Sequence, residues 1–244
     1  MLKHFFYLLL LLCISPQAFS QFASGIPSNF VEAKKAARII WSDHRQDVYC
    51  GCQFDKHLKV DTKSCNYVPF DRLRGKRIEW DHVVPASWFG RQRPCWRENI
   101  CVKKNGKTFK GRQCCEQIDD DFRKMYLDLH NLIPAIGEVN AARSAFRFSE
   151  FTNEDEDEPL NFNGCKIAID FDRHFVVPKD EIKGLIARVY LYMSETYPFT
   201  LSHKQQVMFE KWNKEHPPTS WEKEWNSRVK EVQGNDNRFI SDYR

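Results

Sequence analysis

The sequence predicts one mixed α+β domain that is stapled by disulfide bonds. Its 244 residues are enough for a single large domain. Apolar residues make up 42% of the chain and charged residues 29%, which excludes disorder, collagen and coiled coil as the main state. Helical and alternating apolar patterns are interspersed along the chain, without a repeat or a long linker. The formal net charge of +4 does not by itself identify a nucleic-acid binder.

The first 20 residues have the pattern of a secretory signal peptide, and residues 21–244 then form the mature domain. A basic residue precedes an apolar run over 5–14, and the small residues Ala18 and Ser20 favour cleavage after Ser20. The run is too short for a bilayer, which needs roughly 20 apolar residues. We therefore expect a periplasmic or secreted protein with no membrane-spanning segment in its mature form.

Eight cysteines follow the signal peptide, and in an oxidising compartment they are expected to form up to four disulfides. The sequence leaves the pairing open, although the neighbours Cys114 and Cys115 are expected to take different partners. Structural zinc is the alternative, but neither this pair nor Cys50-Gly51-Cys52 has the spacing of a zinc knuckle. The candidate cysteines are Cys50, Cys52, Cys65, Cys95, Cys101, Cys114, Cys115 and Cys165.

Helices are predicted near both ends of the mature chain. Asn29 can cap an amphipathic helix over 30–44. Pro178 can open another helix, and two more are expected over 203–214 and 220–232. The remaining expectations are an irregular segment over 48–75, a strand over 77–84, short helices over 119–131 and 137–144, an acidic loop over 154–158, and a strand over 167–171.

Residues 90–118 are predicted to form an excursion from the core that disulfides hold in place. This segment is rich in arginine and lysine and contains four cysteines. Its basic side chains can supply charge for binding phosphates, or they can be an ordinary solvated loop. For the two tryptophans nearby, Trp88 and Trp96, core packing is the favoured interpretation.

The first segment with candidate catalytic residues places Asp81 directly before His82 in a strand-like run. Side chains alternate along a strand, so both can serve one site only if the strand ends, twists or bulges there. Pro85 makes a strand end nearby plausible. The second segment contains Asn131 among apolar neighbours. Taken singly, a histidine in a strand such as His82 is more often a hydrogen-bonded core residue than a base, and Asn131 is compatible with a cap.

Together these motifs resemble the bacterial endonuclease I family. The first block is Glu79-Trp80-Asp81-His82-Val83-Val84-Pro85-Ala86, followed by Trp88-Phe89-Gly90. The second runs from Asn131-Leu132 through Pro134-Ala135-Ile136-Gly137-Glu138-Val139-Asn140 to Arg143-Ser144. An earlier block, Tyr49-Cys50-Gly51-Cys52, and a closing block from Trp212 to Ile240 also match. The resemblance spans about 30–240 and implies a ββα-metal (His-Me finger) motif.

The resemblance implies metal-dependent hydrolysis of DNA, and of RNA as well, with little sequence preference and 5′-phosphate products. His82 matches the family's general base, and a neutral imidazole can accept a proton near pH 7. Asp81 and Asn131 match the ligands of one divalent cation, Mg²⁺ or alternatively Mn²⁺ or Ca²⁺. Arg97 is the best match for the arginine that contacts the scissile phosphate.

Three further residues, Glu79, Glu138 and Asn140, would orient the site. The family usually has Glu at position 81, and the shorter Asp81 carboxylate reaches less far, so Glu79 could assist in binding the cation. We expect a monomer that binds nucleic acid through phosphate contacts and whose affinity falls with salt.

Two other functions remain open at this point. One is a secreted, disulfide-rich nucleic-acid-binding module without catalysis, and the other is a nuclease that acts on RNA alone. A zinc protease is disfavoured because no second histidine follows His82 at the spacing of the HExxH motif.

Overall fold

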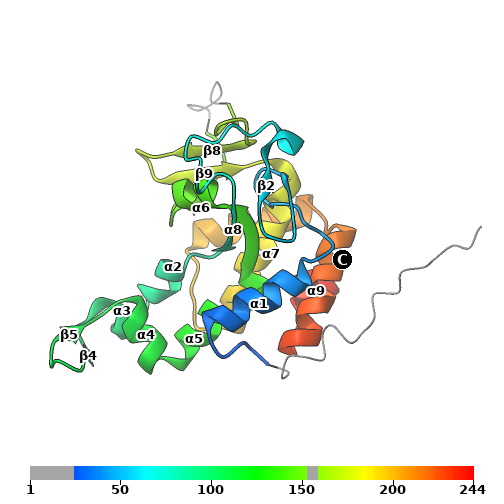
Figure 1. The fold of residues 1–244 in the computed structure, drawn as a ribbon. Helices are drawn as coiled ribbons and strands as arrows, with labels where there is room; N and C mark the ends of the chain where they lie inside the picture. Colours follow the sequence, from blue (N-terminus) through cyan, green and yellow to red (C-terminus); the bar gives the residue numbers. More distant parts are fainter. Residues whose placement is uncertain (1–24, 153–158) are drawn as a thin grey trace, which may run out of the picture.

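The computed structural model describes residues 25–152 and 159–244. The predicted signal peptide and the acidic loop over 154–158 lie outside these residues. No helix within the described ranges is long and apolar enough to cross a membrane. The chain contains both helices and short strands and forms the mixed α+β domain that the sequence predicts (Figure 1).

A two-stranded antiparallel sheet followed by a helix occupies the core. Strand β3 (Ile78–His82) pairs with β6 (Leu132–Ile136), and His82 lies opposite Leu132. All five residues of β6 are buried, and helix α6 (Gly137–Arg143) follows it directly and packs on β3. The strand predicted over 77–84 therefore ends at His82, as Pro85 favours.

Helix α1 (Phe30–Ile40) begins at the predicted cap. The Asn29 side chain accepts hydrogen bonds from the backbone N–H groups of Val31 and Glu32. The helix is shorter than the predicted 30–44. It packs against α5 (Asp120–Leu127) and α9 (Ser220–Gln233), so the first helix of the described chain contacts the last long one.

The helix predicted over 119–131 is divided in the structure. Helix α5 ends at Leu127, and a 3₁₀ turn, η3 (Leu129–Asn131), leads into β6. Asp128 separates the two elements because its side chain accepts a hydrogen bond from the His130 N–H. The same carboxylate accepts hydrogen bonds from the hydroxyls of Tyr192 and Tyr197, so the break is anchored to the C-terminal half.

A second sheet contains a strand that the sequence interpretation missed. Strand β9 (Phe175–Pro178) lies between β7 (Arg147–Phe148), to which it is parallel, and β8 (Ile167–Asp170), to which it is antiparallel. The sheet lies at one edge of the molecule (Figure 1). Pro178 ends this strand and does not itself open the helix, so its predicted role was wrong, although the predicted helix is present. Helix α7 (Asp180–Thr196) begins two residues later.

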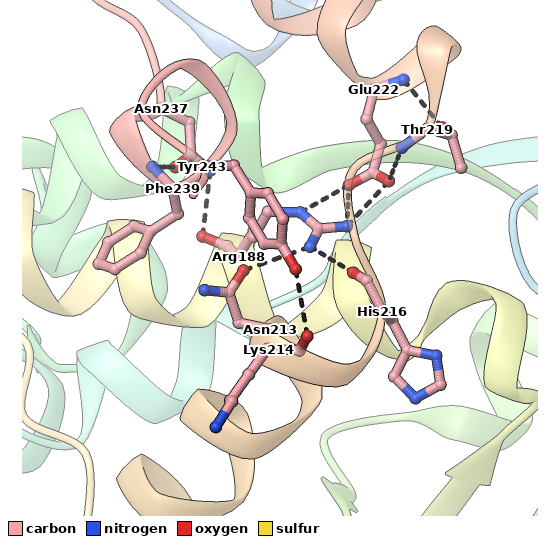
Figure 2. Close-up of polar contacts among 9 residues, drawn as sticks. All are labelled: Arg188, Asn213, Lys214, His216, Thr219, Glu222, Asn237, Phe239 and Tyr243. Atoms are coloured by element: carbon pink, nitrogen blue, oxygen red, sulfur yellow. Dashed lines mark hydrogen bonds and ion pairs between the residues drawn. The ribbon is translucent and has the colours of Figure 1, made fainter.

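Three C-terminal helices are joined by a buried ion pair. Arg188 of α7 donates hydrogen bonds to the Glu222 carboxylate of α9 and to Asn213 of α8 (His203–Glu215). It also donates to the backbone oxygen of His216. Figure 2 shows Tyr243 lying across the same guanidinium, so the end of the chain, after the short helix α10 (Arg238–Ser241), closes this cluster.

The basic excursion forms an arm that begins after α2 (Ala86–Gly90). The arm contains α3 (Pro94–Arg97), the hairpin of β4 (Cys101–Val102) and β5 (Thr108–Phe109), and α4 (Arg112–Ile118). It extends away from α9, with the hairpin at its tip (Figure 1). Trp88 and Trp96 are partly buried against the core, in line with the favoured interpretation.

Four disulfides occur among the described residues, and none of their cysteines is left for zinc. They are Cys50–Cys165, Cys52–Cys65, Cys95–Cys115 and Cys101–Cys114. As predicted, the neighbouring Cys114 and Cys115 take different partners. The segment over 48–75, predicted to be irregular, contains the Cys52–Cys65 disulfide. It also contains a small hairpin, formed by β1 (Gln53–Phe54) and β2 (Val60–Asp61), and a 3₁₀ turn, η2 (Thr62–Cys65).

Candidate active site

The imidazole of His82 lies at the end of β3 in a cluster of aromatic rings. The ring of Phe30, from α1, stacks on it with centroids 5.5 Å apart, and the ring of Tyr126, from α5, stacks on it at 4.9 Å. The Phe30 and Tyr126 rings are themselves 5.0 Å apart. Three elements that are distant in sequence therefore position this one histidine.

A backbone carbonyl determines the tautomer of His82. Its Nε2 lies 2.7 Å from the carbonyl oxygen of Tyr126, and a carbonyl oxygen only accepts hydrogen bonds. Nε2 therefore carries the proton, and Nδ1 keeps its lone pair. Burial lowers the pKa of His82 to about 4, which the Tyr126 carbonyl opposes and the positive charges of Arg112 and Arg143 reinforce. The imidazole is a neutral base at pH 7.

Asp81 points to the opposite face of β3, as strict alternation requires. Its carboxylate accepts a hydrogen bond of 2.7 Å from the Tyr49 hydroxyl and lies 3.3 Å from Nη1 of Arg143. Burial raises the pKa of Asp81, while the guanidinium of Arg143 acts in the other direction. The strand ends at His82 without bringing the two side chains to one face.

Arg143 holds the end of the strand in place. Its guanidinium is fully buried and donates to the carbonyl oxygens of His82 and Val83 as well as to Asp81. A buried cation with these three acceptors satisfies most of its donors, and removing any one acceptor would be costly. The α6 helix thus fixes the backbone from which His82 projects.

The amide of Asn131 is used to clasp the backbone. Its Oδ1 accepts from the Val84 N–H at 2.7 Å, and its Nδ2 donates to the Val84 carbonyl at 3.1 Å. The side chain is fully buried. Asn131, the predicted cation ligand, therefore uses both its amide oxygen and its amide nitrogen to hydrogen-bond the Val84 backbone just after β3, as a neighbouring strand would.

Glu79 and Asn140 lie together on the face of β3 that α6 covers. Nδ2 of Asn140 donates to Glu79 Oε2 at 3.0 Å, and within the described ranges no donor is hydrogen-bonded to Oδ1 of Asn140. Arg74 and Arg77 also donate to the Glu79 carboxylate. Although burial opposes ionisation, these hydrogen bonds hold the pKa of Glu79 below its usual value.

Gly137 allows this approach, because a Cβ there would lie only 2.8 Å from the Glu79 carboxylate. Glu138 does not face the same cluster. It accepts hydrogen bonds from the Tyr67 hydroxyl and from the backbone N–H groups of Phe70 and Asp71, so it orders the loop before β3.

A cavity of about 550 Å³ opens between α1 and β3 beside this cluster. Lys34 and Arg38 of α1 line one side, and Glu79 and Asn140 line the other. Phe30, Leu58, Ile78 and Trp80 also line it and supply apolar surface. The cavity therefore combines cationic, apolar and oxygen-rich surfaces next to the ring of Phe30 that covers His82.

Within the basic arm, the structure brings a different arginine than predicted to the His82 cluster. Arg97 is exposed at the end of α3, and its carbonyl oxygen accepts from Lys110. The guanidinium of Arg112 instead lies 5.5 Å from the centroid of the Tyr126 ring, which stacks on His82. Its position two residues before Cys114, where two disulfides anchor α4, is the signal that could have identified it.

No cluster of three or more His, Cys, Asp or Glu side chains that could hold a metal occurs within 25–152 and 159–244. A metal at this site would therefore need amide, backbone or water oxygens in addition to the carboxylates. Glu79, Asp81 and Asn140 are the oxygen-bearing side chains that share the α6-facing side of β3.

Comparisons with known proteins agree with the resemblance seen in the sequence. A sequence model of the Endonuclease I family matches residues 17–243. An extracellular deoxyribonuclease of Aeromonas hydrophila is 39% identical over 216 residues, which cover 86% of this chain and 87% of the relative. A periplasmic deoxyribonuclease of the same species is 40% identical, with 82% and 80% covered. An Endonuclease-1 of Buchnera aphidicola is 37% identical, with 91% and 84% covered.

Proposed function

The chain belongs to the endonuclease I family and is a nuclease, and from this premise we propose that it hydrolyses the phosphodiester bonds of DNA, and of RNA as well, outside the cytoplasm. The observation that carries the catalytic proposal is the tautomer of His82. A neutral imidazole with Nε2 bound to a carbonyl presents Nδ1 as the proton acceptor. Little sequence preference is expected, because phosphates are the same along any nucleic acid.

His82 acts as the general base in this proposal. Nδ1 takes a proton from a water molecule as the water oxygen attacks the phosphorus. The bond to the 3′ oxygen breaks, and this oxygen takes a proton from solvent water, so the products carry a 5′-phosphate and a 3′-hydroxyl. Such proton transfer contributes roughly 10²–10⁴-fold to the rate. The Tyr126 carbonyl keeps the imidazole oriented and stabilises the positive charge that it acquires.

Nucleases of the endonuclease I family are generally dependent on a divalent cation. When bound, such a cation neutralises charge on the phosphate and on the leaving oxygen. We propose that its protein ligands are Asp81 and Glu79, with the amide oxygen of Asn140 in place of Asn131, and that the scissile phosphate lies beyond the end of β3, where it can approach both the α6-facing side of the strand and the His82 imidazole. These are hard oxygen donors. Asn140 is preferred to Asn131 because Oδ1 of Asn131 already accepts from the Val84 N–H, whereas the described contact of Asn140 with Glu79 uses its Nδ2. A cation bound here would replace present hydrogen bonds of Asp81 and Glu79. Mg²⁺ is the preferred ion, with Mn²⁺ and Ca²⁺ as alternatives.

Arg112 takes the role first expected for Arg97. From its place over Tyr126 it can donate hydrogen bonds to a phosphate held at His82. The two disulfides on α4 support it, since they limit how far the helix can move. Substrate binding then rests on phosphate contacts, and no second subunit is required, so we propose a monomer that is exported by a signal peptide cleaved after Ser20.

The experiment that tests the function is nicking of supercoiled plasmid by the oxidised protein with Mg²⁺, with EDTA, and after His82→Ala. We expect metal-dependent nicking that the substitution abolishes. His57→Ala is the matched control, because this histidine is exposed in a turn. Cleavage of RNA but not of plasmid would favour an RNA-only nuclease, and tight binding without cleavage of either would favour a binding module.

The ligand assignment is tested by comparing Asn140→Ala with Asn131→Ala. Mn²⁺ binding, followed by electron paramagnetic resonance, should weaken at least tenfold for Asn140→Ala. Asn131→Ala should chiefly reduce the stability of the fold. The opposite pattern would return the ligand role to Asn131.

A further inference from the structure

Two cations flank the aromatic cluster that contains His82. Nζ of Lys34 lies 5.2 Å from the centroid of the Phe30 ring, and the guanidinium of Arg112 lies 5.5 Å from that of Tyr126. Both rings stack on the imidazole. The cations come from α1 and α4, which lie far apart in the sequence, and each contacts a different ring of the cluster around His82.

Lys34 has no acidic partner in the part of the chain that the structure describes. Its neighbour Lys35 differs, because Nζ of Lys35 pairs with Glu32 at 2.9 Å. Lys34 is exposed, and its only described contact of this kind is the face of Phe30. An ammonium held over an aromatic ring keeps its charge and most of its hydration, and it remains available to an anion.

The cavity between α1 and β3 gives that charge a place to act. Lys34 lines this cavity together with Arg38, opposite Glu79 and Asn140. Its volume of about 550 Å³ lies within the range of pockets that hold small organic ligands. A phosphate entering beside Lys34 would have the apolar wall of Phe30 and Trp80 next to its sugar.

We propose that Lys34 is a substrate-positioning residue that binds a phosphate neighbouring the scissile one, at the Phe30 edge of the ring cluster, whereas Arg112 lies at its Tyr126 edge. The inference rests on the proposed nuclease function. The nucleic-acid strand then crosses the ring cluster with one phosphate at Arg112 and His82 and the next at the mouth of the α1–β3 cavity. Helix α1, and not the basic arm alone, contributes to the binding surface.

The first test measures how DNA binding depends on salt. Binding of a fluorescent oligonucleotide would be followed by anisotropy in EDTA, so that no cleavage occurs, for the wild type, Lys34→Ala, Lys34→Arg and Lys214→Ala. Losing one phosphate contact should weaken binding roughly tenfold at low salt and reduce the slope of log K against log salt by about one. Lys34→Arg should keep the wild-type slope. The exposed Lys214 of α8 is the charge-matched control and should change neither quantity.

The second test locates the phosphate. Cleavage of oligonucleotides that each carry one neutral methylphosphonate linkage would be compared for the wild type and Lys34→Ala with Mg²⁺. In the wild type, neutralising one linkage next to the cleaved bond should raise KM with little change in kcat. In Lys34→Ala the same neutralisation should have no further effect, because the contact is already lost.

The outcomes separate the two proposals. If the wild type cleaves but Lys34→Ala has the wild-type salt slope and linkage profile, the role of Lys34 is refuted and the nuclease function stands. If the wild type neither binds nor cleaves nucleic acid, the proposed function itself fails. If Lys34→Ala loses its helical circular dichroism signal, Lys34→Gln is tested in its place. The same reduced salt slope and the same loss of the linkage effect are then required of Lys34→Gln.

Discussion

Replacing Phe30 by alanine should move the acid side of the pH–activity profile upward. The Phe30 ring covers one side of the His82 imidazole, and burial is the main cause of its lowered pKa. The general base must be neutral to accept a proton. The wild-type acid limb of kcat should therefore fall near pH 4 and not near 6.5, where an unburied histidine titrates.

The size of the effect follows from the two pKa values. The difference between about 6.5 and about 4 corresponds to about 3.4 kcal/mol against the protonated form. Removing the Phe30 ring should relieve roughly a third to a half of this, because the neighbouring Tyr126 ring still packs on the imidazole. The acid limb of Phe30→Ala is then expected about one pH unit higher, with a loss of about threefold at pH 4.5 and little change at pH 7.5.

The same burial links pH to stability. Between pH 6.5 and 4 the unfolded chain binds a proton at this imidazole, whereas the folded chain does not. This contribution to stability is therefore complete above pH 6.5 and is lost as the pH falls toward 4. The activity profile must be recorded together with circular dichroism, so that loss of the base is distinguished from unfolding.

Steady-state cleavage of a short oligonucleotide at saturating Mg²⁺ gives the profile, and NMR titration of the histidine protons gives the pKa directly. Phe30→Leu keeps an apolar side chain over the imidazole, so its acid limb should lie between those of the wild type and Phe30→Ala. Phe70→Ala removes a ring that is 91% exposed and should leave the profile unchanged. Coincident acid limbs for the wild type and Phe30→Ala, or a wild-type His82 pKa near 6.5, would refute the reasoning.

Three further substitutions test parts of the framework. Asn131→Ala removes two buried hydrogen bonds to the backbone after β3 and should lower the free energy of unfolding, measured in urea, by about 2–3 kcal/mol. A loss below about 0.5 kcal/mol would contradict a stabilising role for the Asn131–Val84 hydrogen bonds. Glu222→Ala leaves Arg188 buried without its carboxylate partner and should lower the free energy of unfolding by about 3–5 kcal/mol. Glu222→Gln keeps a hydrogen-bond acceptor and should lower it less. Equal losses in the two variants would contradict this expectation. Replacing both Cys101 and Cys114 by serine opens the hairpin of the basic arm and should cost about 3 kcal/mol; protease cleavage in the arm as slow as in the wild type would show that the disulfide is not needed there.

Local signals in the sequence predicted the main helices and the end of β3. The Asn29 cap and the apolar period predicted α1, and Pro85 indicated that β3 ends nearby, although the strand stops two residues earlier than predicted. Strand β9 was missed because Phe175-Val176-Val177 is too short to show a period, and because the proline after it is also compatible with a helix start. Short buried strands have no pattern that a single sequence can distinguish from a helix entry.

Assigning roles within the site needed three-dimensional information. A motif places Asn131 and Asn140 in one block, but only hydrogen-bond geometry shows that one amide clasps the backbone and the other lies beside Glu79. Arg97 and Arg112 are equally basic residues of one arm, and the difference between them is a contact with Tyr126. That contact depends on how disulfides fold the arm, and the sequence left the pairing open.

The pairing of the cysteines has a consequence for how the protein is made. With the proposed export the chain would present its cysteines in order, and an oxidant acting on them as they appear would join Cys50 to Cys52 and later Cys115 to Cys165. The native Cys50–Cys165 bond spans 115 residues, and Cys95–Cys115 encloses Cys101–Cys114. Oxidation alone would therefore produce molecules with non-native disulfides. Maturation should depend on an isomerase that exchanges these early disulfides for the native ones, and such reshuffling takes seconds to hours.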